Sequence, residues 1–130
     1  MSADDSTKEE LGSTRDELGR EMFREVLGFE APAGAPTPLS AAVRNFGFAE
    51  VWSRPGLDRR SRRWITLACV TAAGSPNAMR AYANAALASG DITMAELREF
   101  SLQFAVFQGF PKAVEFEQIL NAIEASAKSQ

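Results

Sequence analysis

The first 28 residues carry the periodicity of an amphipathic helix. Apolar side chains recur at spacings of three, four and seven between Leu11 and Leu27. Ser6 followed three residues later by Glu9 forms a capping box, which predicts a helix from Ser6 to Gly28. Because one face of this N-terminal helix (residues 1–28) is apolar, we expect it to pack against another element.

Residues 29–38 interrupt the helical pattern. This segment contains Pro32, Pro36 and Pro38 together with Gly34, so it cannot continue a helix and is predicted to be a connector. A second helix is predicted to begin at Thr37 and Pro38. Its apolar positions include Leu39, Val43, Phe46 and Trp52, and the Arg-Pro-Gly run at residues 54–56 ends it.

Two helices are predicted between Asp58 and Gly90. Asp58 is a good N-cap for a third helix whose residues 64–72 are apolar on most sides, as in a central core element, with Cys69 as an inert core residue. Gly74 breaks this helix. Ser75 is the predicted N-cap of a fourth helix, which Pro76 begins and Gly90 ends.

The last two helices have equally clear boundaries. Thr93 and Glu96 form a capping box that opens a fifth helix, which Gly109 closes, and Pro111 begins the sixth. No segment alternates with period two for long enough to predict a strand. We therefore predict an all-α fold of six helices in a single domain over residues 1–130.

Composition narrows the function classes. With 130 residues, 45% of them hydrophobic and 24% charged, the chain has the balance of a soluble globular protein. A net charge of −3 gives no support for a nucleic-acid partner. No run approaches the roughly 20 apolar residues of a membrane helix. The acidic N-terminus is unlike a secretory signal, so we expect a cytoplasmic protein with no membrane partner.

Several catalytic systems are excluded by residue counts. The chain has one cysteine and no histidine, which removes CxxC redox pairs, thiolate zinc sites and nucleophile–histidine systems. No glycine-rich nucleotide loop is present. Catalysis would have to use carboxylates, Tyr82, arginines, lysines or backbone dipoles, and we predict neither a metal nor a cofactor.

The aromatic residues of the last two helices suggest self-association. They are more numerous than one small core needs, so we expect some to be buried against a second copy. The alternative is that one core absorbs all five: Phe100, Phe104, Phe107, Phe110 and Phe116.

Three motifs resemble those of the carboxymuconolactone decarboxylase family. Residues 51–62 read VWSRPGLDRRSR and are similar to the family's W-x-R-P-G-L-x-x-x-x-R block. Residues 85–90, AALASG, precede Glu96 and Glu99 as in A-A-L-x-x-G…E-x-x-E. Residues 102–113, LQFAVFQGFPKA, resemble the ending L-Q-x-A-V-Y-x-G-x-P-x-A. Their order and spacing agree over about half of the chain.

The resemblance implies an all-helical fold of the alkylhydroperoxidase D-like type that assembles into homotrimers or homohexamers. It also implies a small-molecule pocket in which a carboxylated lactone loses carbon dioxide without a cofactor. The departures from the family pattern concern its reactive residues. Ser75 and Ala78 stand where related peroxidases have their cysteines, Arg63 lies near the position of their glutamate, and Tyr82 replaces the family histidine. A thiol peroxidase is therefore not expected.

Tyr82 is the first candidate for a catalytic role. Ser75, Met79 and Tyr82 are spaced to share one helical face, which the resemblance places toward the pocket. A phenol with a pKa near 10 is a poor general base at neutral pH, but it donates well to a developing enolate or alkoxide. We predict that Tyr82 is catalytic and that Ser75 and Met79 contact substrate. The alternative is a packed core tyrosine with a satisfied hydroxyl.

Arginines and one carboxylate complete the predicted site. Arg44, Arg54 and Arg62 are candidates for binding a substrate carboxylate through paired N–H groups, although they could instead tie loops together. Glu50 and Trp52 end the second helix. A carboxylate beside aromatic surface can have a raised pKa, so we predict Glu50 as a second catalytic residue and Trp52 as a substrate contact. The alternative for Glu50 is solvent exposure.

Three functions fit these observations. The first is a cofactor-independent lyase that acts on a carboxylated lactone or a related carbonyl compound. The second is an isomerase, dehydratase or cyclase of a biosynthetic pathway that uses the same pocket, which the exchange of histidine for Tyr82 favours over the parent reaction. The third is a ligand-binding member of the family without catalysis. We expect an enzyme.

Overall fold

The computed structural model describes the backbone of residues 3–129 and the side chains of residues 14–129. Within these bounds the chain is helical and contains no strand, so the predicted all-α class is confirmed. The chain divides into two compact units, residues 1–57 and residues 58–130, which we describe one at a time. A single domain over residues 1–130 stays a prediction.

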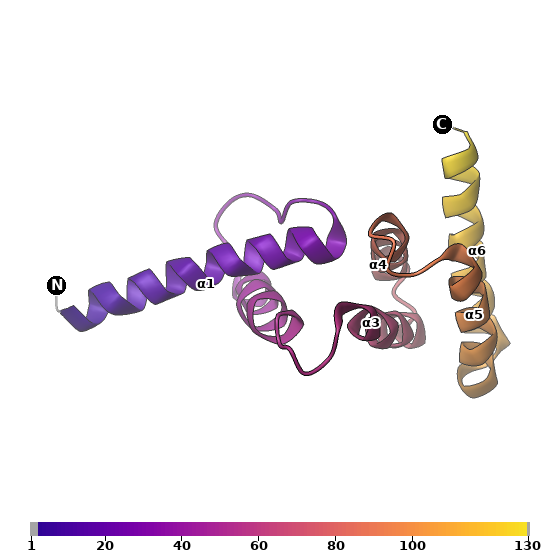
Figure 1. Cartoon of the computed structure of the whole chain (residues 1–130), viewed down its shortest axis with the longest axis horizontal. Helices are drawn as coiled ribbons and strands as arrows, with labels where there is room; N and C mark the ends of the chain where they lie inside the picture. Colours follow the sequence, from indigo (N-terminus) through magenta and orange to yellow (C-terminus); the bar gives the residue numbers. More distant parts are fainter. Residues whose placement is uncertain (1–2, 130) are drawn as a thin grey trace. The chain divides into compact units, whose positions relative to one another are not determined.

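The first unit contains three helical elements, α1 (Ala3–Leu27), α2 (Pro38–Ala42) and η1 (Val43–Trp52). In Figure 1, α1 crosses η1, and the connector loops back from the end of α1 to the start of α2. Thr37 caps α2 in a reciprocal box with Ser40, which confirms the predicted start of the second helix. Helix α1 confirms the N-terminal helix predicted over residues 1–28, although Ser6 lies inside it and does not begin it.

The second helix continues from α2 into η1, which has π geometry over ten residues. This geometry is rare, and the hydrophobic spacing did not predict it. Phe48 and Ala49 of η1 are buried together with Met22 and Val26 of α1. Together with Ala31 of the connector, these side chains are the buried apolar residues of the described part of the first unit.

The second unit is built from α3 (Arg59–Ala73), α4 (Pro76–Ala88), α5 (Met94–Gln108) and α6 (Phe110–Lys128). Helices α3 and α4 form one hairpin, α5 and α6 form another, and α4 packs on α6. The shared core is fully buried and apolar, and it contains Leu67, Met79, Ala83, Ala86, Ile92, Leu97, Phe116, Ile119 and Leu120.

Two of the three predicted side-chain caps of this unit are confirmed. The Asp58 carboxylate accepts a 2.7 Å hydrogen bond from the Ser61 N–H at the start of α3. Thr93 and Glu96 form the predicted capping box of α5. Ser75 occupies the N-cap position of α4, although its side chain makes no capping hydrogen bond.

Cys69 was predicted to be a core residue, and this is wrong because its side chain is exposed. The buried face of α3 is set by Arg63, Leu67 and Thr71, which follow one another at intervals of four residues. Cys69 lies two positions from Leu67 and Thr71, on another side of the helix. No helix of the described part of the chain is long and apolar enough to cross a membrane.

Candidate active site

The eight predicted site residues are divided between the two units. Arg44, Glu50, Trp52 and Arg54 lie in the first unit, whereas Arg62, Ser75, Met79 and Tyr82 lie in the second. We therefore describe two groups of residues, and their roles remain predictions.

Tyr82 lies in the middle of α4 and is half-buried. It packs against the core cluster formed by residues such as Leu67 and Met79. Burial raises the pKa of the Tyr82 phenol above its ordinary value, because desolvation disfavours the charged phenolate. The hydroxyl therefore keeps its proton at neutral pH, and it is suited to donating a hydrogen bond rather than to abstracting a proton.

The neighbours of Tyr82 on the predicted face differ in exposure. Met79 is 1% exposed and belongs to the hydrophobic core, whereas Ser75 is half-buried at the first turn of α4. Arg62 is half-buried on α3, with its Nε shielded from solvent. Arg62 and Ser75 thus reach the surface of the second unit more readily than Met79 does.

An ion pair of the second unit with a buried guanidinium was not predicted. The side chain of Arg63 is 2% exposed, and its Nε donates to Oδ2 of Asp91 over 2.8 Å. Asp91 lies between α4 and α5, so the pair joins the connection between these helices to α3. The family resemblance placed Arg63 near the position of a glutamate in related peroxidases. The hydrophobic periodicity of the sequence could not predict its pairing with Asp91, which lies 28 residues further along the chain.

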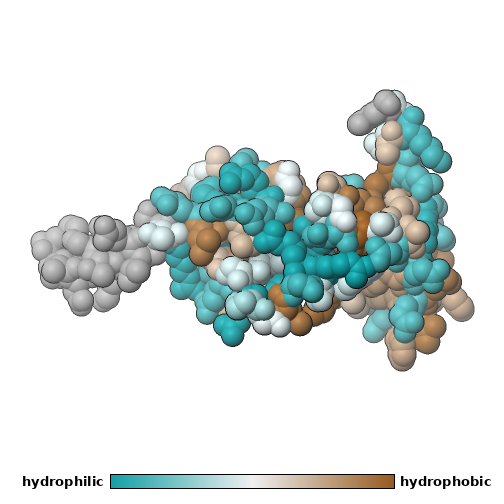
Figure 2. All heavy atoms as spheres, viewed as in Figure 1, coloured by the Kyte–Doolittle hydropathy of each residue, from teal (hydrophilic) through white to brown (hydrophobic). Residues whose placement is uncertain are grey.

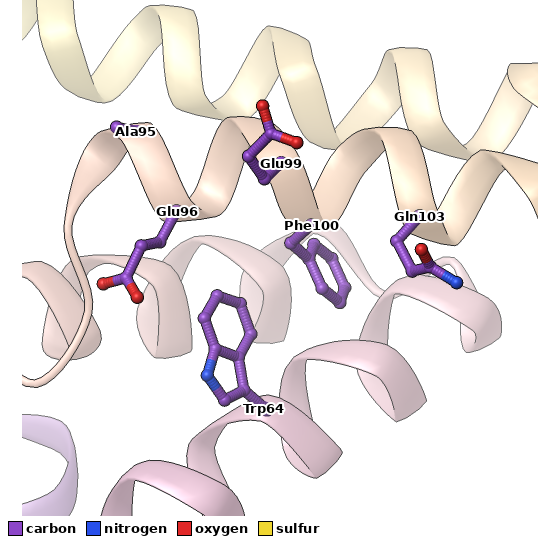
Figure 3. Close-up of a pocket in the computed structure, with 6 residues that line it drawn as sticks. All are labelled: Trp64, Ala95, Glu96, Glu99, Phe100 and Gln103. Carbon is purple, nitrogen blue, oxygen red and sulfur yellow. The ribbon is translucent and has the colours of Figure 1, made fainter.

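A groove on α3 and α5 was also not predicted. It has a volume of about 630 Å³, and Figure 3 shows Trp64 from α3 and Phe100 from α5 next to each other in its lining. Their rings are stacked with centroids 5.7 Å apart. The lining residues are Trp64, Ala95, Glu96, Glu99, Phe100 and Gln103. No pattern in the sequence indicated the groove, because aromatic residues at helical spacing are typical of a core.

Polar contacts at the edge of the groove fix Glu96. The backbone N–H of Thr93 donates to its carboxylate over 3.0 Å and Arg60 donates to it as well. These contacts hold the pKa of Glu96 below its ordinary value, with the Thr93 hydrogen bond as the largest cause. Arg60 also lies 5.7 Å from the ring centroid of Trp64. Glu96 is therefore an ionised capping residue rather than a candidate acid.

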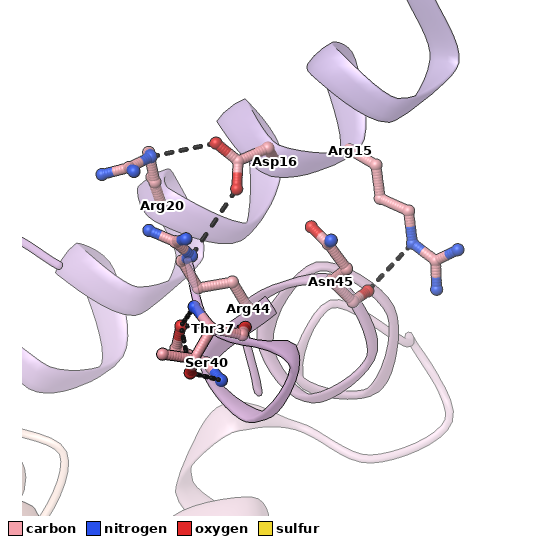
Figure 4. Close-up of polar contacts among 7 residues, drawn as sticks. All are labelled: Arg15, Asp16, Arg20, Thr37, Ser40, Arg44 and Asn45. Carbon is pink, nitrogen blue, oxygen red and sulfur yellow. Dashed lines mark hydrogen bonds and ion pairs between the residues drawn. The ribbon is translucent and has the colours of Figure 1, made fainter. Parts of the chain in front are cut away.

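Arg44 is the most buried of the predicted residues in the first unit. It is 4% exposed, and its Nε lies 3.5 Å from Oδ1 of Asp16 on α1. Figure 4 shows Asp16 between Arg44 and Arg20, whose Nε donates to Oδ2 of the same carboxylate over 3.0 Å. One carboxylate is thus shared by two guanidinium groups.

The other predicted residues of the first unit lie nearer to solvent. Glu50 is exposed, and its carboxylate accepts a 2.6 Å hydrogen bond from Arg15. This is an exposed ion pair, whereas aromatic surroundings had been predicted for Glu50. Trp52 is half-buried and stacks on Phe48, with ring centroids 6.3 Å apart, and Arg54 is exposed in the loop after η1.

Comparison with known proteins identifies the class of this fold. The model of the carboxymuconolactone decarboxylase family matches residues 37–122, so the chain belongs to this family. The predicted resemblance is confirmed. The matched segment begins at the cap of α2 and includes all of η1, α3, α4 and α5.

Two relatives are decarboxylases by name. The chain is 31% identical over 117 residues to the nitrosuccinic acid decarboxylase of Metarhizium robertsii, a match that covers 79% of this chain and 81% of that protein. It is 36% identical over 69 residues to the 4-carboxymuconolactone decarboxylase of Acinetobacter baylyi, covering 53% of this chain and 51% of that protein. The second match therefore spans about half of the relative's length.

Among the described residues, no group of three or more His, Cys, Asp or Glu side chains is arranged to hold a metal ion.

Proposed function

We propose that this protein is a cofactor-independent decarboxylase of a small, activated carboxylic acid. The observation that carries the proposal is the match to a nitrosuccinic acid decarboxylase over about four fifths of both chains. Membership of the carboxymuconolactone decarboxylase family and the partial match to a decarboxylase of that name agree with it. The proposed substrate class is an acid whose carboxylate lies close to a nitro group or to a conjugated lactone.

The chemistry explains why such substrates suit a protein without a cofactor. When the bond to the carboxylate breaks, its electron pair stays on the substrate while carbon dioxide leaves. A nitro group or a conjugated carbonyl accepts that electron pair on oxygen, and a proton is then added to carbon. Donors aimed at the oxygen that gains charge lower the barrier.

We assign the donor role to Tyr82. Its phenol is half-buried, and burial raises its pKa, so the proton is retained at neutral pH. A protonated phenol can donate a hydrogen bond to the oxygen that receives the electron pair. Arg62 is the proposed carboxylate-binding residue of the same unit, with Ser75 and Met79 as further contacts. The roles predicted from the sequence for Glu50, Trp52 and Arg54 of the first unit stay predictions.

The test uses the purified protein with nitrosuccinic acid and 4-carboxymuconolactone as the two substrates. We expect one of them to release carbon dioxide in step with loss of that mass from the substrate. Tyr82→Phe removes only the hydroxyl and should lower kcat by about a hundredfold or more. Glu21→Gln, an exposed change on α1, is the control and should retain the activity of the natural protein.

Other outcomes would overturn the proposal. Conversion of either acid without loss of mass would favour the isomerase or cyclase alternative, and loss of the mass of water alone would favour the dehydratase alternative. Ligand binding by both natural protein and Tyr82→Phe, with no turnover in either, would favour a non-catalytic member. A Tyr82→Phe variant that folds and keeps its full rate would remove Tyr82 from the mechanism and leave the family assignment intact.

We also propose that the protein works as a homo-oligomer, with the trimer or hexamer implied by the family resemblance as the expected state. Several large apolar side chains of α5 and α6 support this, since they are between 65% and 77% exposed: Leu102, Val106, Phe107 and Phe110. Figure 2 shows hydrophobic residues gathered on the visible face of these two helices. Exposed apolar surface of this kind marks interaction sites. A cytoplasmic location stays a prediction.

A further inference from the structure

The strongest unexplained feature outside the second unit is the buried guanidinium of Arg44. Its side chain is 5% exposed, yet its Nε makes no hydrogen bond to any described residue. The ion pair with Asp16, at 3.5 Å, is long for a charged hydrogen bond. Because burial removes water from the Nε–H group, this donor calls for a further acceptor.

Arg44 lines a pocket on the first unit. This pocket has a volume of about 350 Å³, within the size range of small-ligand sites. Its walls come from α1, the proline-rich connector and the start of the second helix. The lining residues are Phe23, Pro32, Ala33, Gly34, Ala35, Pro36, Thr37, Leu39, Ser40, Val43 and Arg44.

The lining of this pocket is apolar apart from a few groups. Arg44 is its one charged residue, and Thr37 and Ser40 bring hydroxyl groups that already bond to one another in the cap of α2. Phe23, Leu39, Val43 and the prolines offer hydrocarbon surface. A ligand that fits needs an apolar body and one group that pairs with a guanidinium.

The charge around Arg44 favours an anion. Asp16 is the carboxylate that both Arg20 and Arg44 contact, so the three side chains together carry one positive charge. Asp16 is about one-third exposed, and it is engaged more closely by Arg20, at 3.0 Å, than by Arg44. A carboxylate that entered the pocket could therefore pair with Arg44 without displacing the contact between Asp16 and Arg20.

We propose that this pocket binds a small carboxylate with a short apolar body, held through its charged end by Arg44. Six of the eleven lining residues precede the segment that the family model matches, whereas Arg44 lies within that segment. The inference does not rest on the decarboxylase proposal, because it concerns binding and holds whether or not the bound acid is the substrate.

The test measures binding of 4-fluorobenzoate by fluorine NMR, with 4-fluorobenzamide as the uncharged analogue of the same shape. We expect the natural protein to bind the carboxylate and to bind the amide at least about tenfold more weakly. Backbone amide shifts of Ala33, Gly34 and Ala35 should respond to the carboxylate, which locates the site. Inorganic phosphate, which lacks the apolar body, should not compete at equal concentration.

Three variants separate this binding role from a structural role. Arg44→Met keeps the length of the side chain and removes its charge, and it should weaken carboxylate binding at least about tenfold. Arg24→Met, on α1 but outside the pocket lining, is the control and should bind like the natural protein. Asp16→Asn removes the competing carboxylate and should strengthen binding, a change that a purely structural Arg44 would not produce.

Two further variants test the binding site even if Arg44→Met fails to fold. In that case Asp16→Asn should still bind the carboxylate more tightly, and Ala33→Phe, which fills the pocket from an exposed connector position, should abolish binding. Equal binding of amide and carboxylate would overturn the proposal. So would the absence of carboxylate binding to the natural protein, or weaker binding to Asp16→Asn.

Discussion

Arg63 and Asp91 form a 2.8 Å ion pair in which the guanidinium is almost fully buried and the carboxylate is one-third exposed. Because Asp91 lies between α4 and α5 while Arg63 belongs to α3, the pair joins segments that are distant in sequence. A guanidinium buried in this way is costly unless its charge is balanced. We therefore expect this ion pair to contribute more to the stability of the second unit than its exposed ion pairs do.

We predict that Asp91→Asn destabilises the protein by about 1–3 kcal/mol, less than for a fully buried pair, because water can partly replace the exposed carboxylate. The measurement is urea unfolding followed by circular dichroism. Glu117→Gln is the control, since the Arg98–Glu117 pair is more exposed and its atoms lie 3.7 Å apart. An equal loss in both variants would show that burial of Arg63 does not set the strength of its pair.

Gly19 of α1 gives a second prediction, because the main chain of η1 lies directly against it. A Cβ atom at residue 19 would lie 2.4 Å from the carbonyl oxygen of Arg44, which is closer than atoms can approach. We expect Gly19→Ala to destabilise the protein by about 1–3 kcal/mol, although alanine is the better helix former. Thermal unfolding measures the effect.

Gly47 supplies the control for this prediction. A Cβ there would have no atom within 4 Å, so Gly47→Ala should be neutral or slightly stabilising. If Gly19→Ala were as stable as Gly47→Ala, the close crossing of α1 and η1 would be wrong.

The parts of the fold that were predicted are those with local causes. Asp58 and Thr93 begin helices because their side chains accept hydrogen bonds from N–H groups three residues later, a pattern that is visible in the sequence. The same reasoning failed at Ser6. The helix extends back to Ala3 through acidic residues, which the positive end of the helix dipole favours.

The features that were missed depend on long-range contacts. The pairing of Arg63 with Asp91 and the groove between Trp64 and Phe100 bring together residues 28 and 36 positions apart, and periodicity does not report such pairs. The π geometry of η1 was missed because a spacing of three or four residues indicates a helix without specifying its pitch. Arg44 was predicted to bind a carboxylate because of its guanidinium group. The pocket that it lines could not be predicted, because the position of the connector is not encoded in a local pattern.

We expect the stability of the second unit to fall at acid pH, because the carboxylates that cap two of its helices become protonated. The folded-state pKa of Glu96 is lowered chiefly by the Thr93 hydrogen bond, and that of Asp58 by the Ser61 hydrogen bond. A carboxylate with a lowered pKa stabilises the fold fully above its unfolded-state pKa, about 4 for these groups, and this stabilisation is lost as the pH falls through the lowered value. We therefore expect the thermal midpoint to fall below about pH 4.

Glu96→Gln tests the origin of this pH dependence. Glutamine keeps the reciprocal cap but has no titrating group, so the variant should lose less stability than the natural protein between about pH 5 and pH 3. Glu99→Gln removes an exposed carboxylate of the same helix and should leave the acid-induced loss unchanged. The same slope for all three proteins would exclude Glu96 as a source.

If the protein self-associates through α5 and α6, polar substitutions on these helices should reduce the size of the oligomer. Phe107 and Phe110 are 77% and 76% exposed, so replacing both with serine removes apolar surface without opening the core. We expect the natural protein to sediment as an oligomer and the double variant to sediment as a smaller species. Leu57→Ser, an exposed change in the loop before α3, is the control and should preserve the oligomer.

The pH dependence of turnover distinguishes a donor at residue 82 from a base. The pKa of Tyr82 is raised by burial, so its proton is retained below the ordinary tyrosine value of about 10 and is lost only above it. If the phenol donates, its titration should leave kcat constant through neutral pH and lower it only in strong alkali. Tyr82→His introduces an imidazole with a pKa near 6.5, so any activity that remains should acquire a new inflection between about pH 5 and 8. A rate for the natural protein that rises toward pH 10 would mean that the phenolate is the active form, and it would reverse the role proposed for Tyr82.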